Sequence, residues 1–145
     1  MEVTDEQIEY FLFEDGDVSG KRFKERAKFW SDFGLGICGY NPVTEQVRLE
    51  MRLYRGVDDN LERTVQAMEK VLPFVKDFGG VKRFKVLEHT LSKFGVYIVE
   101  IGPQSYTLTK TTFGRKSKVA EFTTLRELVE YVQENHFYQS SEDSV

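Results

Sequence analysis

Apolar and polar residues alternate along several short stretches of the chain. The clearest stretch runs from Val47 to Leu53, where the residues between the apolar positions are Arg48, Glu50 and Arg52. A period of two is typical of a strand with one face in the core and the other in water. Shorter alternations predict further strands at Leu35 and Ile37, at Val96 and Ile98, at Tyr106 and Leu108, and over residues 116–122.

Between these stretches the apolar residues recur every three or four positions, which is the period of an amphipathic helix. Helices are predicted over residues 21–32 and 83–93, each followed by a glycine, Gly34 or Gly95, that can end it in a left-handed conformation. Two further helices are predicted over Leu61–Val71, capped by Asp58 or Asp59, and over residues 125–134, capped by Thr123 or Thr124. Pro73 should end or bend the first of them. Residues 7–13 fit either a helix or a strand.

Two parts of the chain resemble each other. Residues 21–42 and 82–103 share nine identities in 22 aligned positions without a gap, including the run Lys-Arg-Phe-Lys and the pair Phe-Gly. We therefore expect a tandem duplication of an α-β-β-(β)-α unit in an α+β fold, with an antiparallel sheet of four to six strands and helices on one face. The predicted divisions are an acidic segment at 1–18, repeats at 19–77 and 80–138 that share one globular domain, and a disordered tail at 139–145.

Composition places few limits on function. The chain has 145 residues, 40% of them hydrophobic and 14% aromatic, which is enough for one core, and its single cysteine excludes an internal disulfide. No apolar run approaches the roughly 20 residues of a membrane span. The expected location is the cytoplasm, without membrane association. The net charge of −4 conceals an excess of bases in the body of the chain, because the first 17 residues hold seven acids and no base.

Two short motifs suggest ligands but fit other roles better. Gly34-Leu35-Gly36-Ile37-Cys38-Gly39 has the glycine spacing of a dinucleotide loop. It follows a predicted helix and leads into a turn, whereas that loop must follow a strand and open a helix. Asp15, Asp17 and Ser19 resemble the start of a calcium loop, but the twelfth position holds Arg26 in place of a bidentate carboxylate. A tightly packed strand and a capping turn are the preferred interpretations.

The chain offers little for catalysis. His89 and His136 are its only histidines, and Cys38 lies on a predicted strand, where a free cysteine usually packs as a small apolar residue. No residues have metal-ligand spacing. We therefore expect a protein without catalytic residues, cofactor or metal.

Binding remains, in two competing forms. The first is a protein partner, unidentified by the sequence, held by an exposed sheet edge or aromatic surface of a monomer or homodimer; the protein would act as an adaptor, inhibitor or chaperone-like module. The second is nucleic acid, because residues 106–118 hold four bases and no acid. The candidate surface is the same in both cases: Arg48, Arg52, Arg55, Tyr106, Lys110, Phe113, Arg115, Lys116 and Lys118.

Overall fold

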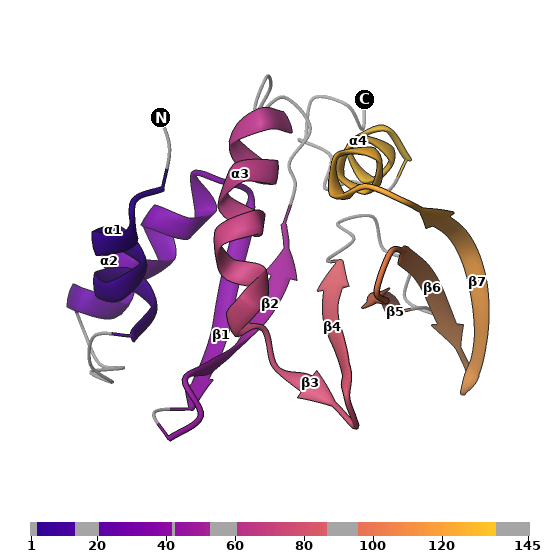
Figure 1. The fold of residues 1–145 in the computed structure, drawn as a ribbon, viewed down its shortest axis with the longest axis horizontal. Helices are drawn as coiled ribbons and strands as arrows, with labels where there is room; N and C mark the ends of the chain where they lie inside the picture. Colours follow the sequence, from indigo (N-terminus) through magenta and orange to yellow (C-terminus); the bar gives the residue numbers. More distant parts are fainter. Residues whose placement is uncertain (1–2, 14–20, 42, 53–60, 87–95, 136–145) are drawn as a thin grey trace.

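The structure is a computed structural model that describes residues 3–13, 21–41, 43–52, 61–86 and 96–135. Within these residues the fold is α+β, with four α-helices and a seven-stranded sheet (Figure 1). The helical segments are α1 (Asp5–Ile8), a π-helical turn (Glu9–Phe13), α2 (Lys21–Ser31), α3 (Leu61–Val71), a 3-10 turn (Leu72–Phe74) and α4 (Leu125–Asn135). The strands are β1 (Leu35–Asn41), β2 (Gln46–Met51), β3 (Asp77–Phe78), β4 (Val81–Val86), β5 (Val96–Ile101), β6 (Tyr106–Thr112) and β7 (Arg115–Phe122).

The sheet is mixed, which corrects the prediction of a purely antiparallel one. Its order is β1-β2-β4-β5-β6-β7, with β3 paired to the first two residues of β4. The other pairs are antiparallel, but β2 and β4 run parallel, with Glu50 opposite Lys85 and Met51 opposite Val86. A parallel pair needs a crossover, and α3 supplies it between the two strands.

The structure does not confirm the duplication. The first Lys-Arg-Phe-Lys run opens helix α2, whereas the second lies in strand β4. The helix predicted over 83–93 is therefore wrong for 83–86, and its remainder lies outside the described residues. Tertiary pairing explains the difference, because β4 is hydrogen-bonded to β2 on one side and to β5 on the other.

The later part of each predicted unit agrees better with the structure. In the first, the hairpin β1–β2 precedes α3; in the second, β5, β6 and β7 form a meander that precedes α4. The alternation predicted in the first hairpin is confirmed, since Val47, Leu49 and Met51 are buried and Arg48 is exposed. The extra strand predicted over 116–122 is also present, as β7.

The segment between the two predicted repeats forms a small hairpin. Asp77 pairs with Lys82 and Phe78 with Val81, across a turn in which Gly79 and Gly80 have φ of 67° and 91°. Glycine adopts such angles without the steric cost that a side chain would add. Pro73 lies in the 3-10 turn that follows α3, as the sequence predicted.

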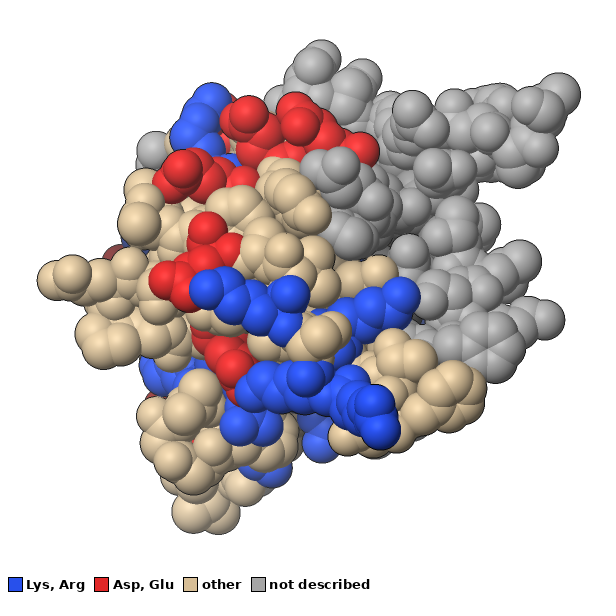
Figure 2. All heavy atoms as spheres, turned by 90° about the vertical axis from the view of Figure 1, so that its right-hand side faces the viewer, with Lys and Arg blue, Asp and Glu red and all other residues tan. Residues whose placement is uncertain are grey.

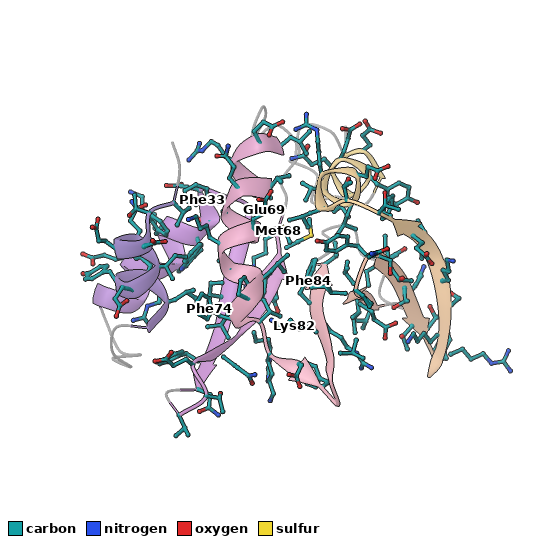
Figure 3. All side chains as sticks on the ribbon, viewed as in Figure 1. Phe33, Met68, Glu69, Phe74, Lys82 and Phe84 are labelled. Atoms are coloured by element: carbon teal, nitrogen blue, oxygen red, sulfur yellow. The ribbon has the colours of Figure 1, made fainter. Side chains whose placement is uncertain are left out.

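Helices α3 and α4 cover one face of the sheet (Figure 1), and the core lies beneath them. Met68 of α3 and Phe84 of β4 are among its fully buried side chains (Figure 3). The Lys82 ammonium donates to the carbonyl oxygens of Leu72 and Pro73, in the 3-10 turn after α3, at 3.2 and 2.8 Å. Helices α1 and α2 lie beside the β1 edge, where Trp30 is buried.

Polar contacts fix the helix ends. Helix α2 ends at Ser31 and is followed by a turn that closes at Gly34, which has φ 75° and donates its amide to the Ser31 carbonyl. At the start of α4 the hydroxyl of Thr124 accepts from the Glu127 amide at 3.1 Å, which identifies the cap. Hydrogen bonds donated by the hydroxyls of Thr124 and Thr123 to the Glu127 carboxylate lower the pKa of Glu127. Both hydroxyls favour the charged form.

Candidate partner-binding surface

The sheet face turned away from α3 and α4, which we call the open face, carries most of the charged strand residues. One row of laterally paired residues crosses five strands: Glu50, Lys85, Ile98, Thr109 and Lys118. Their neighbours along each strand, such as Phe84 and Val99, point into the core. Because side chains alternate across a sheet, the row belongs to the opposite face.

Acids on the open face pair with its bases. The Glu100 carboxylate accepts from the Lys116 ammonium at 2.6 Å, and Nε of Arg83 lies 3.5 Å away. Lys118 pairs with Glu121 at 2.9 Å, and Figure 2 shows bases and acids interleaved over the β7 side of the molecule. A surface built to hold phosphates would carry bases without such partners.

The pair between Lys116 and Glu100 also explains a buried threonine. Lys116 lies on β7 and Glu100 on β5, so the pair must pass over β6. Thr109 of β6 is only 4% exposed although it faces away from the core, and its hydroxyl donates to the Ile98 carbonyl at 3.1 Å. The Thr109 hydroxyl is therefore satisfied although it is buried.

The turn between β6 and β7 carries the most unusual residue of the surface. Thr112 pairs with Arg115, so Phe113 and Gly114 form a two-residue turn, with φ of 50° and 78°. Two positive angles define a turn that favours Asn-Gly, because a bulky side chain in this region costs about 1–2 kcal/mol. Phe113 is also 85% exposed, so burial in the core does not offset that cost.

Strand β7 forms one edge of the sheet among the described residues. Its first four residues, 115–118, are exposed and carry three bases. Its register with β6 shifts between Leu108 and Thr109, so that Val119 is an extra residue. Bases and a bulge are both devices by which edge strands avoid pairing with copies of themselves.

The structure divides the predicted surface between several places. Arg48 and Arg52 flank Glu50 on β2; Nε and Nη2 of Arg52 donate to the Glu50 carboxylate at 3.0 and 2.8 Å, and its side chain lies against Gly36. Lys116 and Lys118 share the open face with them. Lys110 instead lies on the helix side, where its ammonium is 5.3 Å from the centroid of the Tyr97 ring.

The remaining predicted residues lie elsewhere. Tyr106 is half-buried against the core, Phe113 lies in the β6–β7 turn, and Arg115 is the first residue of β7. Arg55 lies outside the described residues, as do both histidines and the calcium-like segment at 15–20. Cys38 lies on β1, as predicted.

A pocket that sequence reasoning missed opens on the open face, between β2 and β4. It has a volume of about 230 Å³. Its lining residues are Arg48, Leu49, Glu50, Phe78, Arg83, Phe84, Lys85 and Ile98. The alternation of Arg83 and Lys85 with Phe84 and Val86 could have revealed a strand here, but the resemblance to residues 21–24 favoured a helix.

The part of the chain that the structure describes shows neither a cluster of metal ligands nor a membrane-spanning helix. These residues contain no group of three potential metal ligands. None of their helices is both long and apolar enough to cross a bilayer. Comparisons with models of protein families, with curated proteins and with solved structures gave no match.

Proposed function

We propose that this protein is a non-catalytic protein-binding module, an adaptor, inhibitor or chaperone-like protein. Its partner contacts the β6–β7 turn and the exposed edge of β7. The observation that carries the proposal is Phe113, whose left-handed backbone and 85% exposure are both unfavourable for an isolated fold. Strained residues of this kind cluster at functional sites, and exposed aromatic side chains are typical anchors of protein interfaces.

The chemistry of the β7 edge indicates the character of the partner. Arg115, Lys116 and Lys118 follow one another along an exposed strand. Antiparallel pairing with a second copy would bring these bases together, and like charges in opposite positions are destabilising. A strand or loop of a different protein is therefore the favoured partner, with an apolar site to receive the Phe113 ring.

Nucleic acid is the competing candidate, supported by the same bases. The ion pairs on the open face speak against it, because Glu100 and Glu121 already pair with Arg83, Lys116 and Lys118. Lys110 faces the other side of the sheet, beside Tyr97. The bases of the predicted hairpin therefore do not form one uninterrupted phosphate-binding row.

The proposal can be tested by photo-crosslinking in cells of the source organism. A benzophenone amino acid replaces Phe113 in one variant and Val43 in the control. Val43 is a matched control because it is 89% exposed on the loop between β1 and β2 and belongs to no proposed interface. Crosslinked proteins are identified by mass spectrometry, purified and titrated against the unmodified chain.

We expect position 113 to capture a protein that position 43 does not, and Phe113→Ala to weaken its binding at least about tenfold. Equal capture at both positions, or an affinity unchanged by Phe113→Ala, would show that the turn is not the interface. Capture of nucleic acid at position 113 would favour the competing function.

A further inference from the structure

The pocket on the open face results from the way in which β2 and β4 separate. The two strands pair at only two positions, Glu50 with Lys85 and Met51 with Val86. Near its start, β2 instead contacts the chain that follows α3. Val47 forms a bridge with Val75, and the Lys76 amide donates a hydrogen bond to the Val47 carbonyl at 2.8 Å. The pocket lies where the strands diverge, and the β3 residue Phe78 forms one wall.

The pocket combines apolar surface with a basic rim. Leu49, Phe84, Ile98 and Phe78 supply the apolar part. Phe78 is 44% exposed, although a ring of this size usually gains by burial. A volume of about 230 Å³ exceeds the ~150 Å³ of an engineered cavity that holds benzene, so one large side chain fits.

The rim carries three bases. Arg48 and Lys85 form no ion pair with any residue that the structure describes. The Arg83 guanidinium lies between the Phe78 ring, 5.9 Å from its centroid, and the Glu100 carboxylate. Arg48 and Lys85 are therefore the charges that a bound acid would meet.

The single acid of the lining does not cancel this charge. Oε1 of Glu50 accepts from both Nε and Nη2 of Arg52, whose side chain lies against Gly36 of β1. The positive charge of Arg52 offsets the negative charge of Glu50 through these charge-assisted hydrogen bonds. The lining therefore presents a net positive charge to an occupant.

We propose that this pocket binds an acidic peptide segment of a protein partner, with one large apolar side chain inserted and flanking carboxylates held by Arg48 and Lys85. The inference rests on the proposed function only in assigning the occupant to a protein. The site is separate from the Phe113 turn.

The test uses nuclear magnetic resonance titration of the ¹⁵N-labelled full chain with the peptide acetyl-Asp-Glu-Phe-Glu-Asp-amide. We expect saturable shifts at Phe78, Lys85 and Ile98, with a Kd of about 1 mM or tighter. Phe78→Ala and the double variant Arg48→Gln/Lys85→Gln should each weaken binding about fivefold or more. Lys28→Gln is the matched control, since it removes an exposed base on α2, outside the pocket and the β7 edge, and should leave the affinity unchanged.

Four further probes define the chemistry. The same peptide with alanine in place of phenylalanine, or with lysine in place of every acid, should bind at least about fivefold more weakly. Free phenylacetate and adenosine 5′-monophosphate should also bind more weakly than the peptide. The proposal is overturned by absent binding, by equal binding of the alanine or lysine peptide, by tighter binding of either small molecule, or by an affinity that the pocket variants leave unchanged. None of these results would affect crosslinking at position 113, so the two proposals can fail independently.

Discussion

Lys116 on β7 and Glu100 on β5 form an ion pair across the strand between them, with 2.6 Å separating Nζ from Oε2. The same carboxylate oxygen lies 3.5 Å from Nε of Arg83 on β4. One acid thereby connects three strands of the open face. It also accounts for the burial of Thr109 beneath the pair.

Replacing Glu100 with glutamine should destabilise the fold by about 1 kcal/mol. The change keeps the shape but removes the charge facing Arg83 and Lys116, whose side chains are 39% and 54% exposed, so solvent limits the loss. Urea denaturation measures the effect. Glu121→Gln is the control and should cost less than about 0.5 kcal/mol, because within the described residues Glu121 pairs only with the exposed Lys118. Equal costs for the two variants would refute the connecting role of Glu100.

The same variant separates the two proposed functions. If the open face bound phosphates, removing the Glu100 charge would release Lys116 and strengthen binding to nucleic acid. We expect no binding of labelled single- or double-stranded oligonucleotides by either the wild type or Glu100→Gln. Fluorescence anisotropy at about 50 mM and about 200 mM salt measures this. Salt-sensitive binding that is stronger in Glu100→Gln would favour the nucleic-acid function.

Thr64 should be sensitive to loss of its hydroxyl. It is fully buried on α3 and donates to the Phe33 carbonyl at 2.8 Å, which connects α3 to the end of α2. Thr64→Val keeps the shape of the side chain but removes the donor to that carbonyl, so the free energy of unfolding should fall by about 1–3 kcal/mol. Thr64→Ser retains the donor and should lose less. If the serine variant is the less stable of the two in thermal unfolding, the hydrogen bond is not the main contribution.

Removing the Thr124 hydroxyl should change both stability and titration. Thr124→Ala removes the cap of α4 and should cost about 1 kcal/mol. The pKa of Glu127 should rise toward its usual range, because one of its two hydroxyl donors is lost. Since the pKa of Glu127 is lower in the folded state, its stabilising contribution is present above the unfolded pKa and disappears as pH falls through the folded pKa. If a carbon-detected nuclear magnetic resonance titration gave the same Glu127 pKa in Thr124→Ala as in the wild type, it would contradict this prediction.

Local patterns in the sequence predicted much of the fold. The alternation around Leu49, the helix over Leu61–Val71 and a threonine cap of α4 depend on short-range periodicity and on one hydroxyl, and all three are confirmed. The sequence left the cap open between Thr123 and Thr124, and the structure identifies Thr124. The ends of β6 and β7 follow from the turn at Phe113-Gly114, which the sequence alone did not place.

The errors arose where distant residues decide the structure. The run Lys-Arg-Phe-Lys is helical in α2, where the residues that follow it, Glu25, Arg26 and Ala27, also favour a helix. The same run is extended in β4, where the two neighbouring strands supply hydrogen bonds. Local identity therefore did not fix local structure. The pocket beside Phe78 was invisible for the same reason, because it depends on the parallel pairing of β2 with β4.

Phe113→Asn should stabilise the fold. Asparagine adopts the left-handed conformation of this turn at little cost, so the free energy of unfolding should rise by about 1 kcal/mol. The same change removes an aromatic ring that is 85% exposed and that the proposed function assigns to the partner. Affinity for the captured protein should therefore fall.

The measurement that tests this account most directly combines both readouts on Phe113→Asn, with Val43→Asn as the control. Urea denaturation gives the stability, and calorimetric titration with the protein captured at position 113 gives the affinity. We predict higher stability with binding at least about tenfold weaker for Phe113→Asn, and unchanged binding for Val43→Asn. Lower stability with unchanged binding would mean that Phe113 serves the fold, and would contradict the account.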